Sequence, residues 1–144
     1  MTQTGDCDLE RFVDAQRETY DRALAEIRAG QKQSHWMWFV FPQVAGLRSS
    51  AMAERYAIAS ADEARAYLAH PILGPRLVEC ATAVLAVRGR SAHDIFGSPD
   101  DVKLRSSATL FAHVSPAGSV FHRVLDQYFD STPDRRTCSL ILRP

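Results

Sequence analysis

The spacing of the apolar residues constrains the fold more than any other feature of this chain. Between residues 8 and 29 they recur every three or four positions, which is the repeat of one face of an α-helix. The same spacing returns in later segments, and no segment shows the sustained alternation and hairpin turns of paired strands. We therefore expect an all-α fold, a compact bundle of about six to eight short helices.

Serines, aspartates and prolines divide this pattern into separate helices. A serine or aspartate side chain can cap the first N–H groups of a helix, and proline is tolerated in the first turn but ends a helix further on. The predicted helices are 8–29 as one helix or two with a kink, 34–42 capped by Ser34 and stopped by Pro42, 61–69 capped by Ser60, a helix from Pro75 to near Gly89, 92–96 capped by Ser91, a helix from the Ser98 cap through Phe111, 119–129, and a last helix from Asp134 toward Leu142.

The length and the charge balance limit the class of protein. A chain of 144 residues is expected to form one helical domain, 1–144, with residues 1–7 as a disordered tail. The 17 basic and 17 acidic residues argue against broad binding of nucleic acid or anionic membranes. The longest apolar run, 36–42, is far shorter than the roughly 20 residues of a membrane span. The N-terminus lacks the pattern of an export signal, so we expect a cytoplasmic protein.

The cysteines and histidines give no sign of a metal site. Cys7, Cys80 and Cys138 are widely spaced, and no two histidines have a ligand spacing such as H-x-x-x-H. Cys80 falls in an apolar helical stretch, so we interpret it as a core residue. No glycine-rich phosphate loop or dinucleotide motif is present. We predict no metal and no cofactor, and the sequence does not indicate an oligomeric state.

Four aromatic residues occupy a six-residue stretch: Trp36, Trp38, Phe39 and Phe41. One interpretation is that this block is the central core element, because aromatic side chains bury large areas. The other is that the two tryptophans, together with His35 and Gln43, wall a pocket in which a ring-shaped ligand stacks. Three residues that follow could add an anion contact and a hydroxyl to the same wall: Arg48, Arg55 and Tyr56.

A second group of polar residues lies inside one of the predicted helices. Lys103 and Ser107 are four residues apart and share a helical face, where they could hold a phosphate or carboxylate with Ser106 or Thr109 as a further donor. The alternative is a solvated helix face whose hydroxyls bond back to carbonyls of the same helix. Asp100 and Asp101 lie just before this group, and we interpret both as residues that complement the helix dipole.

Two of these blocks carry a family resemblance, SHWMWFVFPQ at 34–43 and KLRSSATLF at 103–111. With them, the chain resembles a bacterial family of small cytoplasmic proteins of unknown function, some of which carry a misleading automatic label of calpastatin. The resemblance runs from about Asp8 to Leu142, and the two blocks are its hallmark. It implies a compact, mostly helical, single-domain fold and no established activity, so no catalytic residues carry over.

Two functions stay open on the sequence. The first is a small enzyme or binding protein for a compact anionic metabolite, such as a nucleotide or an ADP-ribose derivative, with Trp36 or Trp38 stacking and Lys103 binding the anion. The second is a non-catalytic helical interaction module whose aromatic block is only core.

His35 and Ser107 are weak candidates for catalysis. The histidine could act as an acid or base, and it could activate the serine as a nucleophile if their side chains lie within hydrogen-bond reach. A pocket lined jointly by His35, Gln43 and Lys103 would favour the metabolite-binding function over the interaction module.

Overall fold

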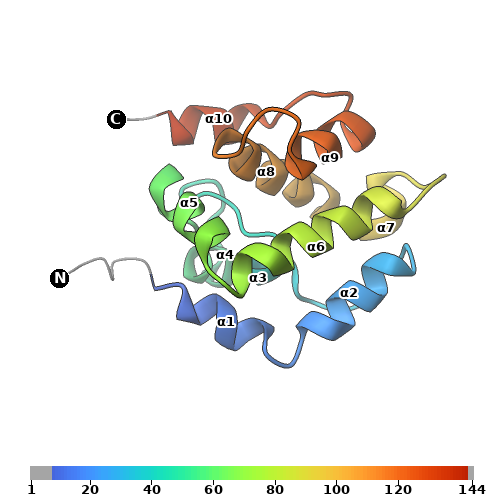
Figure 1. Cartoon of the computed structure of the whole chain (residues 1–144), viewed down its shortest axis with the longest axis horizontal. Coiled ribbons are helices and arrows are strands. Elements are labelled where there is room, and N and C mark those ends of the chain that lie inside the picture. The colour runs from blue at the N-terminus through green and yellow to red at the C-terminus, as the bar shows by residue number, and fades with distance from the viewer. Residues whose placement is uncertain (1–7, 143–144) are drawn as a thin grey trace.

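The computed structural model describes residues 8–142, so the expected N-terminal tail, 1–7, lies outside the described residues, as do 143–144. The described part is helical, as predicted, but its ten helices exceed the expected six to eight. The helices are α1 (Glu10–Gln16), α2 (Tyr20–Arg28), α3 (Met37–Val40), α4 (Ala51–Arg55), α5 (Ala61–Ala69), α6 (Leu73–Ala86), α7 (Ala92–Phe96), α8 (Asp100–His113), α9 (Val120–Tyr128) and α10 (Arg135–Ile141) (Figure 1).

Two departures raise the helix count. The segment predicted as one helix or two between residues 8 and 29 is two, α1 and α2, separated by a turn at 17–19. Helix α4 was not predicted at all. It has five residues and none of them is buried, so it carries no apolar stripe by which periodicity could find it. Its start has a local signal, because the Ser50 hydroxyl accepts a hydrogen bond from the backbone N–H of Ala53 at 3.1 Å.

Three of the predicted helix caps are confirmed, and two are wrong. The helices α5, α7 and α10 are capped as predicted by Ser60, Ser91 and Asp134. Helix α9 is capped by Ser119, which was not predicted as a cap. Ser34 does not cap α3, which begins after Trp36, because its hydroxyl donates to Glu26 instead. Ser98 does not cap α8, whose N-terminal flanking residue is Pro99 and has no side-chain cap.

Helix α6 also begins and ends earlier than predicted. It starts at Leu73, two residues before the proline expected at its first position, and it ends at Ala86. Pro75 still lies in the first turn, where backbone N–H groups have no partner within the helix, so the missing proline N–H costs nothing.

Helix α6 is central to the arrangement (Figure 1). It crosses the molecule with α1 and α2 along one side and α8, α9 and α10 along the other, and it packs against α2, α5 and α9. Helix α5 approaches α6 very closely at Gly74. A Cβ atom at that position would lie 2.1 Å from the backbone oxygen of Leu68, so the packing of this helix pair depends on a residue without a side chain.

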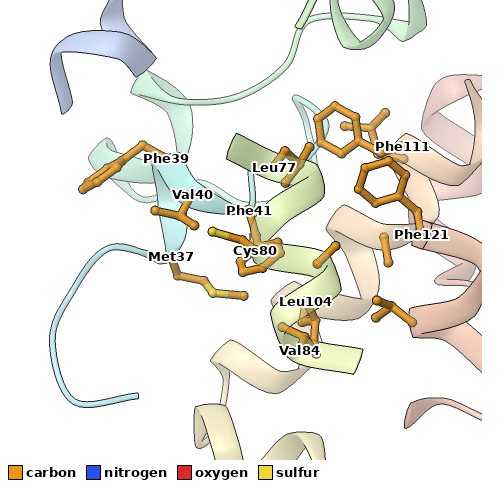
Figure 2. Packing of buried hydrophobic residues seen from close by; sticks show 14 of the residues in the cluster. Met37, Phe39, Val40, Phe41, Leu77, Cys80, Val84, Leu104, Phe111 and Phe121 are labelled. Carbon is orange, nitrogen blue, oxygen red and sulfur yellow. The ribbon is translucent and has the colours of Figure 1, made fainter. Parts of the chain in front are cut away.

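Apolar side chains from the α3 segment, α6, α8 and α9 form one buried core cluster. Figure 2 shows part of this cluster, whose members include Met37, Val40, Phe41, Leu77, Cys80, Val84, Leu104, Phe111 and Phe121. Cys80 is fully buried, which confirms that it is a core residue. Burial raises the pKa of its thiol to about 12, so it stays protonated at neutral pH.

One short non-helical contact fixes the end of the aromatic block. Val44 and Ile58 form an isolated parallel bridge, in which Ile58 N–H donates to Gln43 O and Ala45 N–H donates to Ile58 O, both at 2.8 Å. This bridge closes the loop that carries α4 and places Gln43 beside α3. Within residues 8–142 the longest helices have 14 residues, and none is long and apolar enough to cross a membrane.

Candidate functional site

The two tryptophans of the aromatic block occupy different environments. Trp36 is completely buried, and its indole N–H donates to Glu26 Oε1 at 2.8 Å. The prediction that Trp36 stacks on a ligand is therefore wrong for this structure, because its ring has no exposed face. Phe39 and Phe41 are buried as well, so the core interpretation holds for these three side chains.

Glu26 organises the backbone that leads into the block. Its carboxylate accepts hydrogen bonds from Gln33 N–H, Ser34 N–H, the Ser34 hydroxyl and the Trp36 indole, at 2.6–3.0 Å. Partial burial raises the pKa of Glu26, but the hydrogen bonds from Ser34, Gln33 and Trp36 outweigh it and bring the pKa down to about 2. The carboxylate is thus a structural group that is ionised at neutral pH.

Trp38 is only partly buried and lines a hollow at the surface. Four residues singled out from the sequence line this hollow, namely Trp38, Gln43, Arg48 and Tyr56. Val44 and Ala53 complete the lining. Gln43 is held by Arg48, whose Nε donates to Gln43 Oε1 at 3.0 Å. The hollow itself has a volume of about 10 Å³, room for roughly one water molecule. Any larger ligand would have to lie over the exposed part of Trp38 rather than inside this hollow.

Lys103 lies next to Trp38, on α8. Its ammonium nitrogen is 5.5 Å from the centre of the Trp38 ring, within the range of a cation–π contact. It also forms an ion pair with Asp100 Oδ1 at 3.3 Å. The Lys103 side chain is 14% exposed, so this helix face is not solvated as the alternative interpretation expects. The other half of that interpretation is confirmed, because the Ser106 and Thr109 hydroxyls donate to carbonyls of the same helix.

A second lysine reaches the same carboxylate. Lys32 Nζ lies 2.8 Å from Asp100 Oδ2, donates to Ser34 O at 2.6 Å, and is 5.0 Å from the centre of the Trp36 ring. Its side chain is 7% exposed. These are the only two lysines among the 17 basic residues of the chain, and both converge on Asp100. Asp100 therefore bridges two lysines and is more than a residue that complements the helix dipole.

Two lysines share one carboxylate beside the aromatic block, and Arg48 lines the hollow at Trp38. Lys32 and Lys103 share one carboxylate, and no Asp or Glu within the described chain lies within 4.0 Å of Arg48. Burying two ammonium groups with only one carboxylate is unfavourable, because one positive charge is left without a counter-charge. A bound anion would supply that counter-charge. We call Lys32, Arg48, Asp100, Lys103 and Trp38 the cationic cluster.

Comparison with known proteins places the chain among relatives. A family described as proteins of unknown function, DUF1810, matches residues 6–141. The chain belongs to this family. It is also similar to a solved structure, the conserved hypothetical protein Rv1873 from Mycobacterium tuberculosis, with 52% sequence identity, a TM-score of 0.93, and coverage of 95% of this chain and 98% of the other. No curated protein matches. The expected resemblance to a family of unknown function is thus confirmed, whereas the hallmark role of the two blocks stays a prediction.

The other predicted site residues of this DUF1810 chain do not join the cationic cluster. Ser106 is fully buried, and its hydroxyl donates to Val102 O at 3.3 Å within its own helix. His35 is exposed in the connection between α2 and α3, and the hollow that Gln43 lines includes neither His35 nor Lys103. Ser107 is 1% exposed and its hydroxyl has no hydrogen-bond partner among residues 8–142, so His35 does not activate it in this structure. Arg55 donates no side-chain hydrogen bond among the described residues; its guanidinium lies over the neighbouring Tyr56 ring.

Sequence reasoning missed Lys32 and misread Asp100. A signal for Lys32 was available, because a chain with two lysines against fifteen arginines uses lysine where a compact ammonium is needed. Within residues 8–142, no group of three or more His, Cys, Asp or Glu side chains is arranged to hold a metal ion.

Replacing Ser107 by alanine should leave the protein as stable as the parent or stabilise it by about 1 kcal/mol. The reason is that a buried hydroxyl without a partner loses its hydrogen bonds to water on folding and gains none. Thr109→Val is the matched control, because Thr109 Oγ1 donates to Arg105 O and accepts from Asp134 N–H, both at 2.8 Å, and the variant should lose about 1–2 kcal/mol. Urea unfolding followed by circular dichroism measures both. A clear loss of stability in Ser107→Ala would contradict the unpartnered state of this hydroxyl.

Proposed function

We propose that this protein binds a compact anionic metabolite that also carries an aromatic ring, such as a nucleotide or an ADP-ribose derivative. The ring lies over the exposed part of Trp38, and the phosphate is held by Lys103, Lys32 and Arg48. The observation that carries the proposal is that two largely buried lysines, Lys32 and Lys103, share the one carboxylate of Asp100, and that Lys103 also lies beside the Trp38 ring. Lysine and arginine are the side chains that bind phosphate best, and an indole face accepts a stacked base.

The proposal is for binding. Catalysis would in addition require the bound metabolite to place a reacting group next to His35, the candidate acid or base. The alternative is a non-catalytic helical interaction module. It is favoured by the burial of Trp36, Phe39 and Phe41 in the core and by the small volume of the hollow beside Trp38. The two functions predict different results when a small anionic metabolite is added: the first predicts binding at Lys103, and the second predicts none.

We expect Lys103→Met to weaken metabolite binding about tenfold, because it removes one charged hydrogen-bond donor and keeps the apolar stem. The fold should survive, because Lys32 remains paired with Asp100. The measurement is isothermal titration with ADP-ribose, AMP and inorganic phosphate. Arg65→Met is the control, since Arg65 is an exposed cation on α5 and its loss should leave binding unchanged.

A footprint of the lysine side chains tests the location independently. An amine-specific acetylating reagent can modify only Lys32 and Lys103 among the side chains, and mass spectrometry separates the two. A bound metabolite should slow the modification of Lys103. If none of the three ligands binds, or if binding is equally tight in Lys103→Met, the metabolite proposal fails and the interaction module becomes the better explanation.

A further inference from the structure

A separate pocket lies between the last three helices, away from the residues of the cationic cluster. It has a volume of about 330 Å³, which is at the lower end of the range for small-molecule sites. Helices α8, α9 and α10 each contribute one face, and the α9–α10 connection closes one side (Figure 1). Its polar lining includes two histidines, His113 and His122, the carboxylate of Asp126 and the hydroxyl of Ser131, and its apolar lining includes Ala112, Leu125 and Ile141.

Helical spacing brings the polar groups of the pocket together. His122 and Asp126 are four residues apart on α9 and therefore share the face that lines the pocket. The His122 ring is held in place, because its Nδ1 lies 2.7 Å from the Ser119 hydroxyl. Leu125 and Ile141 give the pocket an apolar wall beside these polar groups.

The backbone at the rim of the pocket is in a costly conformation. Asp130 and Ser131 have positive φ angles of 53° and 59°, in the left-handed region that side chains other than glycine enter at a cost. This conformation directs the Ser131 hydroxyl to Asp126 Oδ1, to which it donates at 2.7 Å. It also lets Ser131 N–H donate to Leu125 O at 3.0 Å. The pocket therefore keeps a defined rim at which the Asp126 carboxylate is oriented.

Asp126 is the one carboxylate among the described residues that line the pocket, and these residues include two histidines, His113 and His122, but no lysine or arginine. No Lys, Arg or His nitrogen in the part of the chain that the structure describes lies within 4.0 Å of the Asp126 carboxylate. A carboxylate without a cation partner beside an apolar wall is complementary to a molecule with an ammonium group on an apolar body. We infer that this pocket binds a small organic amine, with its ammonium group on Asp126 and its apolar part against Leu125 and Ile141.

Three probes of the same shape and different charge test the inference. They are 2-phenylethylamine, 2-phenylethanol and phenylacetate, titrated against the protein and followed by NMR shifts of the Leu125 and Ile141 methyl groups. For a fragment of this size we expect the amine to bind with a Kd of about 1 mM. The alcohol and the carboxylate should bind at least about fivefold more weakly, because they lack the cation.

Two substitutions locate the binding. Asp126→Asn should reduce the affinity for the amine to that for the alcohol, and Asp130→Asn is the matched control. It removes a neighbouring carboxylate, asparagine tolerates the same left-handed backbone, and Asp130 does not line the pocket. Ala112→Leu fills the cavity and should abolish binding of the amine while circular dichroism shows an intact fold. The inference is overturned if no probe binds, if phenylacetate binds as tightly as the amine, or if Asp126→Asn or Ala112→Leu binds the amine like the parent.

Discussion

Replacing Gly74 by alanine should destabilise the fold by about 3 kcal/mol, a large loss for a single methyl group. The added Cβ would lie 2.1 Å from the Leu68 backbone oxygen, far inside the contact distance of two atoms. The neighbour is backbone and not a flexible side chain, so α5 and α6 would have to move apart. The buried side chains on both helices, including Tyr67 and Leu73, would then lose contacts. Urea unfolding followed by circular dichroism measures the effect.

Gly89→Ala is the matched control for this prediction. Gly89 has a φ of +75°, and a Cβ there would meet nothing within 4 Å. The free energy of unfolding of this variant should fall by about 1 kcal/mol, the cost of an alanine in a left-handed backbone conformation. A Gly74→Ala variant no less stable than Gly89→Ala would show that the two helices are not held at this distance.

Replacing Glu26 by alanine should also cost about 3 kcal/mol. The variant removes the acceptor of four hydrogen bonds, and it leaves the buried indole N–H of Trp36 without a partner. Glu26→Gln keeps one acceptor oxygen and should lose less. Denaturant unfolding at pH 7 measures the difference between the two variants.

The same carboxylate should make the stability depend on pH. In the folded chain the pKa of Glu26 is about 2, below the value of about 4.3 for an unfolded glutamate. A lowered pKa stabilises the fold above the unfolded value, and the stabilisation is lost as the pH falls from about 5 toward 2. Glu26→Gln should therefore show a shallower loss of stability across this range than the parent. Glu18→Gln, on an exposed glutamate, should follow the parent. Identical acid profiles for the parent and Glu26→Gln would contradict the role of this group.

The helices that were predicted well have strong local signals. Helix α9 has an apolar stripe and a serine cap, and α7 has a complete capping box formed by Ser91 and Asp94. Helix α4 lacks buried residues, and Ser34 has a hydroxyl that a distant glutamate captures. The spacing of residues within one segment cannot predict a hydrogen-bond partner that lies on another helix.

The candidate site was predicted only in part for the same reason. Trp38 and Lys103 were predicted to act together, and they do lie in contact although 65 residues separate them. The sequence could not tell which tryptophan is buried, because that depends on Glu26 reaching Trp36. Nor could it show that Lys32 would join Lys103 on Asp100, since this ion pair forms only when α8 packs beside the segment after α2.

The different burial of the two tryptophans gives the protein an internal optical reporter. They are its only indoles, and Trp36 is completely buried in the core while Trp38 is partly exposed beside a cation. A dissolved quencher can reach one ring and not the other, so the quenchable part of the emission comes from Trp38. The fluorescence of Trp38 would thus report changes at the surface, and quenching of Trp36 would report opening of the core, without any added label.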